Sequence, residues 1–208
     1  MWNNTILVEI SHLRMEHTNR LFPIFVKMEQ FRVLIVGGGA VGLEKLTAIL
    51  RNSPATPITL VAPDILAEIQ NYVIAFPKVI LKEKDFELSD LNEQNFVIAA
   101  TDDKILNTEI KKAAAQKGIL TNVADTPDEC DFYLASIVQK GDLKIAISTN
   151  GKSPTIAKRL KEVLNAVLPT ELDAILQDMT AIRQRLQGNF AEKVKTLNKI
   201  TKILAHRP

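Results

Sequence analysis

Several residue types that carry common chemistries are scarce in this chain of 208 residues. It has one cysteine, Cys130, so no internal disulfide can form and a reducing, cytoplasmic location is expected. Its three histidines, His12, His17 and His206, lie near the chain ends, which argues against a histidine-based dehydrogenase or a His/Cys metal cluster. No run approaches the roughly 20 apolar residues of a membrane helix, so no membrane partner is expected.

Charge is unevenly distributed along a chain of otherwise ordinary globular composition, 46% hydrophobic and 24% charged. Residues 1–150 carry 15 Lys/Arg against 19 Asp/Glu, whereas residues 151–208 carry 11 against 5. The basic C-terminal part suits a small polyanionic partner, with solvated helix faces as the alternative interpretation. It contains no basic run interleaved with aromatic residues, so no nucleic-acid partner is expected.

Apolar runs alternate with helical spacings over the first two thirds of the chain. Continuous β-branched stretches of this kind are typical of buried parallel strands. Alternating β and α units predict an α/β fold with a Rossmann-type parallel sheet and helices on both faces. The expected strands are 33–36, 58–62, 79–81, 96–100 and 119–123, and the clearest helices are 41–50 and 103–117.

The pattern changes near residue 125. Two strand-like runs, 133–138 and 143–148, predict a hairpin, and the chain then reads as helix from Ser153, an N-cap residue followed by Pro154. A two-stranded ribbon is marginal alone, which favours a homodimer. The predicted domains are a 1–18 extension, a 19–125 NAD-binding Rossmann domain, a 126–152 β dimerisation segment and a 153–208 helical region.

The pattern Gly37-x-Gly39-x-x-Gly42 lies between a predicted strand and a predicted helix. In such a loop the glycines permit a tight turn, close approach of a pyrophosphate and close helix packing. A glycine-rich turn that binds nothing is the alternative. We predict these cofactor-binding residues at the ends of the first, second and fourth strands: Gly37, Gly38, Gly39, Ala40, Val41, Gly42, Pro63, Asp64, Thr101 and Asp102.

No arginine follows the second strand to meet a 2′-phosphate, so NAD is favoured over NADP. Asp64 stands slightly later than the usual ribose-binding acid, and capping of the next helix is an equal alternative for it. Capping is likewise the alternative role of Asp102 and Asp103.

Four segments in order, 22–41, 99–103, 121–127 and 147–154, resemble the precorrin-2 dehydrogenases, the N-terminal module of siroheme synthase. The resemblance implies a Rossmann domain, a dimerisation region and a helical region in an intertwined homodimer. It also implies NAD-dependent oxidation of precorrin-2, a tetrapyrrole, to sirohydrochlorin in siroheme biosynthesis. Some members of that family insert ferrous iron as well, so a ferrochelatase activity is a second implication.

The resemblance assigns a catalytic role to Asp125, which could take the proton lost as hydride leaves for the nicotinamide. A turn role before Pro127 is the alternative. Glu44 replaces an arginine that the family often has. The predicted substrate-binding residues, several of which would suit the carboxylates of precorrin-2, are Asn122, Thr149, Lys152, Ser153, Lys158 and Arg159.

Two other classes of function compete with this interpretation. A non-enzymatic NAD-binding regulatory module would explain the glycine loop and a dimer, but not Asp125 together with the 149–154 segment. A nucleic-acid-binding protein would use the basic helices and would bind DNA in a strongly salt-dependent way.

Overall fold

The computed structural model describes residues 19, 21–169, 172–185 and 190–201. They form two compact units. The first comprises the described residues up to Leu134 together with Thr149–Ser153, and the second comprises Ala135–Ser148 and the described residues from Pro154 onward. These bounds differ from the predicted domain limits at 125 and 152, and the predicted 1–18 extension lies outside the described residues.

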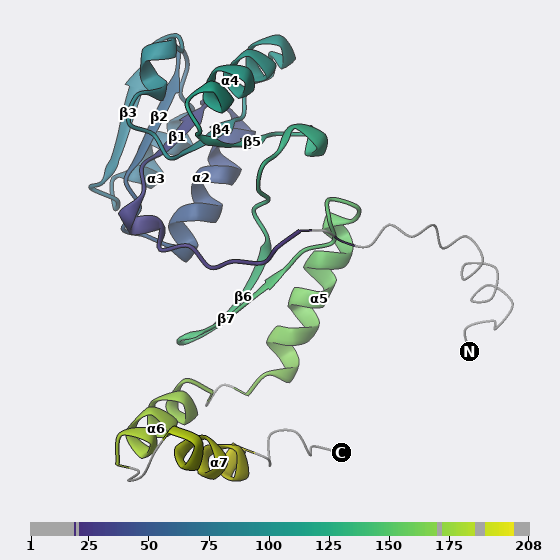
Figure 1. Ribbon diagram of the computed structural model, residues 1–208. Helices are drawn as coiled ribbons and strands as arrows, with labels where there is room; N and C mark the ends of the chain where they lie inside the picture. The colour runs from purple at the N-terminus through teal and green to yellow at the C-terminus, as the bar shows by residue number, and fades with distance from the viewer. Residues whose placement is uncertain (1–18, 20, 170–171, 186–189, 202–208) are drawn as a thin grey trace, which may run out of the picture. The chain divides into compact units, whose positions relative to one another are not determined.

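The first unit is built on a parallel sheet of five strands in the order β3-β2-β1-β4-β5 (Figure 1). This arrangement confirms the predicted fold class. The chain places β2 and β3 on one side of β1 and then crosses to β4 on its other side. The strands are β1 Val33–Val36, β2 Ile58–Ala62, β3 Val79–Glu83, β4 Phe96–Ala99 and β5 Leu120–Val123.

Helices cover both faces of this sheet, because successive side chains of a strand point to opposite faces. Val33 and Ile35 of β1 pack in one apolar cluster with residues of α2 and α3, whereas Leu34 and Val36 pack in a second cluster with residues of α4. All four β1 residues are buried, as the continuous apolar run predicted. The helices are α2 Ala40–Asn52, α3 Ala67–Val73 and α4 Lys104–Gln116, with short 3-10 turns η1 Met28–Gln30, η2 Leu88–Leu91 and η3 Pro127–Glu129.

The second unit pairs an antiparallel hairpin with helices. Strands β6 (Ser136–Lys140) and β7 (Leu143–Ile147) form the hairpin, and the helices are α5 Pro154–Val167, α6 Leu172–Arg185 and α7 Phe190–Thr201. Helix α5 begins at Pro154, as predicted, and packs against both strands. The backbone N–H of Asp142 in the hairpin turn donates to the Asp173 carboxylate of α6 at 2.9 Å.

The first hairpin strand begins later than predicted, at Ser136 instead of residue 133. The reason is that the preceding residues are used by the first unit. Phe132 and Leu134 pack against its core, and the Tyr133 hydroxyl donates to the Pro127 carbonyl at 2.9 Å. Among the described residues, no helix is long and apolar enough to cross a membrane.

Asp90, in η2, carries a carboxylate that is 3% exposed. It accepts hydrogen bonds from Lys84 at 2.8 Å, from Lys82 at 3.2 Å and from the backbone N–H of Glu87 at 3.1 Å. Burial alone would raise the pKa of Asp90, but the hydrogen bonds from Lys84, Glu87 and Lys82 hold it below its ordinary value. The ionised form is therefore the one that the fold stabilises.

Replacement Asp90→Asn is expected to lower the free energy of unfolding by about 1–3 kcal/mol at neutral pH, because it removes a buried, charge-assisted hydrogen-bond acceptor. The folded pKa lies below the unfolded one, so this difference is complete above the unfolded pKa and declines as pH falls through the folded pKa. Urea unfolding of the unaltered protein and of Asp90→Asn, from neutral pH down through the folded pKa, measures this difference in the free energy of unfolding. A difference that stays constant or grows on acidification would contradict the role given to the carboxylate.

Candidate functional site

The loop from β1 to α2 has the strand–loop–helix context expected for a dinucleotide site. Gly37 adopts a positive φ of 125°, and its N–H donates to the Val61 carbonyl at 3.0 Å. A Cβ at Gly37 would collide with the carbonyl of Ala100, and one at Gly42 would collide with the carbonyl of Gly37. These two glycines are therefore required by the packing of the protein itself.

Gly38 and Gly39 differ in what surrounds them. A Cβ at Gly38 would meet the Asp64 carbonyl, and the Gly38 carbonyl accepts from the N–H of Leu66 at 3.0 Å. At Gly39, however, a Cβ would have no heavy atom within 4 Å, and the backbone is in an ordinary extended conformation. Gly39 is also the N-cap of α2 and has no side chain to accept from the first-turn N–H groups of the helix. This geometry fits a bound pyrophosphate.

The segment after β2 leaves Asp64 available to a ligand. Pro63 and Asp64 are exposed. Helix α3 begins at Ala67, with Leu66 as its N-cap and no side-chain cap. The alternative role of Asp64 as the cap of this helix is therefore not observed.

The segment after β4 is held by a residue that the sequence did not single out. Asn107 of α4 is buried, and its amide makes three hydrogen bonds to Thr101, involving the N–H, the carbonyl and the hydroxyl of that residue. Asp103 caps α4 by accepting from the N–H groups of Ile105 and Leu106, as one of the two aspartates was predicted to do, whereas Asp102 is exposed. The available signal in the sequence was an asparagine at the fourth position of the helix that follows a strand end.

Asp125 follows β5 at the same edge of the sheet. The N–H of Ala124 extends the ladder by donating to the Ala99 carbonyl at 2.9 Å, and Asp125 then adopts a positive φ of 59°. Its side chain is exposed, and its carboxylate makes no hydrogen bond or ion pair with any residue that the structure describes. The side chain therefore makes no Asx-type bond, but Asp125 does lie in a turn, because the N–H of Thr126 donates to the Val123 carbonyl at 3.4 Å.

The Thr149–Ser153 loop, which belongs to the fourth segment of the family resemblance, lies beside the segment that contains Asp125. In the Thr149–Ser153 loop the Thr149 hydroxyl donates to the Ser153 carbonyl and accepts from the Ser153 N–H, both at 3.1 Å. A Cβ at Gly151 would lie 3.6 Å from Pro127, which places the two loops next to each other within the first unit. Lys152 of this loop is exposed.

The remaining predicted substrate-binding residues have different surroundings. Asn122 is buried in β5, where its amide donates to the Phe132 carbonyl at 2.9 Å. Lys158 and Arg159 belong to α5 in the second unit, and the Arg159 guanidinium pairs with Glu162 at 2.7 Å. The structure thus brings Thr149, Lys152 and Ser153 together with the Asp125 motif.

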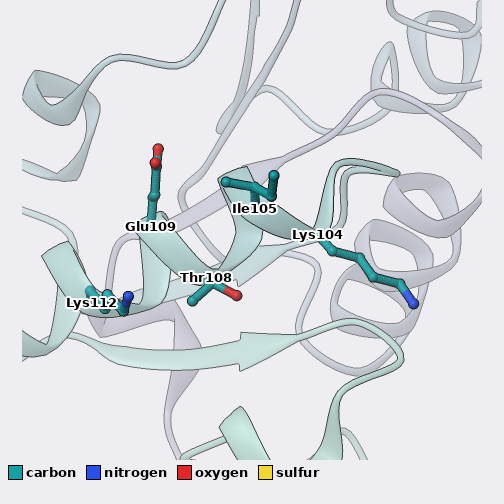
Figure 2. Close-up of a pocket in the computed structure, with 5 residues that line it drawn as sticks. All are labelled: Lys104, Ile105, Thr108, Glu109 and Lys112. Atoms are coloured by element: carbon teal, nitrogen blue, oxygen red, sulfur yellow. The ribbon is translucent and has the colours of Figure 1, made fainter.

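A pocket of about 350 Å³ lies elsewhere, on the outer face of α4 (Figure 2). All of the residues that line it in the described part of the chain come from this helix, and none is a predicted site residue. They are Lys104, Ile105, Thr108, Glu109 and Lys112. The described residues also contain no group of three His, Cys, Asp or Glu side chains able to hold a metal ion.

Comparison with known proteins gives two family matches. Residues 24–136 match the model of a family described as "Putative NAD(P)-binding", and residues 140–166 match one described as "Sirohaem biosynthesis protein central". The chain is 34% identical to a siroheme synthase of Ruthia magnifica over 173 residues, covering 83% of this chain and 34% of that protein. It is 35% identical to a siroheme synthase of Psychrobacter cryohalolentis over 176 residues, covering 85% of this chain and 32% of that protein.

The chain therefore spans about a third of the length of these curated relatives. Among solved structures it is similar to SirC, a precorrin-2 dehydrogenase, with a TM-score of 0.70 and 27% identity, covering 86% of this chain and 89% of that one. Because the first family model covers more than half of the residues, the chain belongs to this NAD(P)-binding family and is a relative of the siroheme synthases and of SirC.

Proposed function

We propose that this protein is an NAD-dependent precorrin-2 dehydrogenase, which oxidises precorrin-2 to sirohydrochlorin in siroheme biosynthesis. The observation that carries the proposal is the carboxylate of Asp125, which is exposed and has no partner among the described residues, at the sheet edge that also bears the glycine loop. Ligands of open parallel sheets bind outside the carboxyl ends of the strands. The name of SirC and the matches to siroheme synthases support the same reaction.

In this proposal each loop of the edge has a separate task. Gly38 and Gly39, with the first N–H groups of α2, hold the pyrophosphate, while Asp64 and Thr101 contact the rest of the dinucleotide. NAD, when bound, supplies the nicotinamide that accepts a hydride from the substrate. Asp125 takes the proton that the substrate loses along with the hydride, so that the macrocycle gives up two electrons and two protons in all.

Basic and polar groups near Asp125 would hold the substrate. Precorrin-2 carries several carboxylates, and an exposed ammonium such as Lys152, in the loop beside the Asp125 loop, suits them. Thr149 and Ser153 of the same loop remain proposed contacts of this kind, whereas Lys158 and Arg159, which belong to the second unit, remain predictions from the sequence. Iron insertion and a cytoplasmic location remain predictions from the sequence.

The second unit supports a homodimer. Four apolar side chains recur along one stripe of α5 and are 45–67% exposed: Ile156, Leu160, Val163 and Val167. A contiguous exposed apolar patch usually marks an interaction surface. The hairpin β6–β7 is also a two-stranded sheet, which gains stability by packing on further structure. We therefore propose a second copy of this chain as the partner.

Replacement Asp125→Asn is expected to reduce precorrin-2 oxidation by at least about 100-fold while leaving NAD affinity within about twofold, because the amide keeps the shape but cannot accept a proton. Asparagine also tolerates a positive φ. Anaerobic incubation with enzymatically made precorrin-2 and NAD, followed by NADH absorbance, measures the rate. Asp128→Asn, an exposed carboxylate three residues away, is the matched control.

Sustained turnover by Asp125→Asn would remove that residue from the chemistry. NAD binding by the unaltered protein without any oxidation of precorrin-2 would favour the regulatory-module alternative instead.

Replacement Gly39→Ala should weaken NAD binding by roughly 10-fold or more without changing the melting temperature, because the added methyl group enters open space that the pyrophosphate would occupy. Gly37→Ala, in contrast, should destabilise the fold by about 1–3 kcal/mol, since it adds strain at a positive φ and a collision with Ala100. Isothermal titration with NAD and thermal unfolding separate the two effects. Unchanged NAD affinity in Gly39→Ala would show that the loop does not contact the cofactor.

Replacement Val163→Glu is expected to convert a dimer into a monomer, because it places a charge in the centre of the exposed stripe of α5. Light scattering coupled to size-exclusion chromatography gives the mass directly. Lys161→Glu, which changes an exposed charge on the same helix, is the control and should remain dimeric. A monomeric unaltered protein, or a dimeric Val163→Glu variant, would contradict the proposed interface.

A further inference from the structure

The residues Ala124–Phe132, here the Asp125 loop, hold Asp125 in a conformation that its backbone does not favour. A left-handed backbone is disfavoured for residues other than glycine, although Asn and Asp adopt it more readily than the rest. Asp125 adopts it with a φ of 59°, and its own side chain makes no bond to a described residue that would offset the cost. Such conformations persist where surrounding contacts determine them. The contacts that hold this loop therefore lie on other residues.

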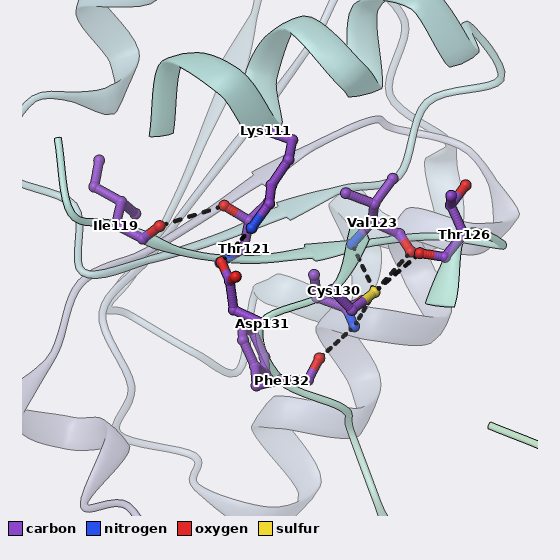
Figure 3. Close-up of polar contacts among 9 residues, drawn as sticks. Lys111, Ile119, Thr121, Val123, Thr126, Cys130, Asp131 and Phe132 are labelled. Atoms are coloured by element: carbon purple, nitrogen blue, oxygen red, sulfur yellow. Dashed lines mark hydrogen bonds and ion pairs between the residues drawn. The ribbon is translucent and has the colours of Figure 1, made fainter. Parts of the chain in front are cut away.

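The first contact is made by the thiol of Cys130. Its Sγ accepts from the N–H of Val123 at 3.2 Å and lies within donor distance of two carbonyls, that of Val123 at 3.2 Å and that of Thr126 at 3.4 Å (Figure 3). The amide of Asn122 donates to the same sulfur at 3.4 Å. Burial raises the pKa of Cys130, so the thiol keeps the proton that it donates. Cys130 thereby joins the end of the loop to the residues on both sides of Asp125.

The second contact is made by Asp131. Its backbone N–H donates to the Thr121 carbonyl at 2.8 Å, and its carboxylate accepts from the Thr121 N–H at 2.8 Å. The ammonium of Lys111, on α4, pairs with the same carboxylate oxygen at 2.5 Å (Figure 3). Asp131 therefore fastens the returning end of the loop to β5 and, through Lys111, to the helix that packs on the sheet.

We propose that Cys130 and Asp131 are positioning residues for the reaction, which hold the Asp125 loop closed so that its free carboxylate stays in one place. This inference rests on the proposed function. Both residues lie at the returning end of the loop and fasten it to β5, Cys130 through Val123 and Asp131 through Thr121, and none of these bonds uses the Asp125 side chain. Other residues therefore hold the loop, and the Asp125 carboxylate stays available to accept a proton. A carboxylate that was itself bonded to the loop would have to break that bond first.

Cys130→Ala removes the thiol contacts and is expected to lower kcat by about 10- to 100-fold, because small misplacements of a catalytic group have effects of that size. The NAD dissociation constant should stay within about twofold, since the glycine loop is separate from these contacts. Cys130→Ser keeps a group that donates and accepts, and should recover most of the rate. Hydrogen exchange of the Val123 and Thr126 amides should be faster in Cys130→Ala than in Cys130→Ser.

Thr56→Ala is the matched control. It removes a buried hydroxyl that donates to the Ser53 carbonyl at 2.8 Å. Thr56 lies just before β2, at the amino ends of the parallel strands, whereas the candidate site lies at their carboxyl ends. It should lower stability without changing kcat. Asp131→Asn provides an independent second variant, because it removes the ion pair with Lys111, whose two side chains are 20% and 36% exposed, and should lower kcat by a smaller factor than Cys130→Ala.

An unchanged kcat in both Cys130→Ala and Asp131→Asn would overturn the positioning role, even if Asp125→Asn is inactive and the proposed function stands. A fall in kcat no larger than that of Thr56→Ala would overturn it as well. If the unaltered protein does not oxidise precorrin-2, the proposed function fails and the positioning role fails with it. Faster amide exchange in Cys130→Ala, together with an intact NAD affinity and a reduced kcat, supports both.

Discussion

The candidate site depends on a close contact between two backbones of the first unit, at Gly37 after β1 and at Ala100 after β4. No side chain fits between them, and the chain crosses from one side of β1 to the other at this point in the sheet. The contact fixes the glycine loop against the segment that contains Thr101. The next strand continues the same edge, since Ala124 bonds to Ala99 and Asp125 follows. The candidate site thus depends on glycine at position 37, where a Cβ would collide with the Ala100 backbone.

Stability and the proposed chemistry are carried by different groups. The two apolar clusters and the bonded carboxylate of Asp90 hold the sheet and its helices, while the carboxylate of Asp125 contributes no bond to the described part of the fold. Cys130 and Asp131 contribute to both stability and the proposed chemistry, because they bond to β5 and hold the loop that contains Asp125. A substitution at either position should therefore affect rate more than it affects the sheet.

Sequence patterns predicted the parts of this arrangement that depend on near neighbours. The buried run at β1, the glycine loop, the cap at Asp103 and the start of α5 at Pro154 all follow from local rules, and the structure confirms them. The hairpin start was wrong because residues such as Phe132 pack against the core of the first unit. Asn107 bonds to Thr101 six residues earlier, and Cys130 bonds to Val123 seven residues earlier. Neither separation is a helix or strand period or a motif spacing, so these patterns did not single out the two side chains.

The Thr149–Ser153 loop returns to the first unit after the hairpin has been made in the second. The chain consequently passes between the units three times, after Leu134, after Ser148 and after Ser153. Cutting the polypeptide at any one of these points would leave at least one unit incomplete. Neither unit could therefore be transferred whole to another protein by joining the chains at a single point. The loop beside Asp125 therefore cannot be exchanged separately from the hairpin that precedes it and the helix that follows it.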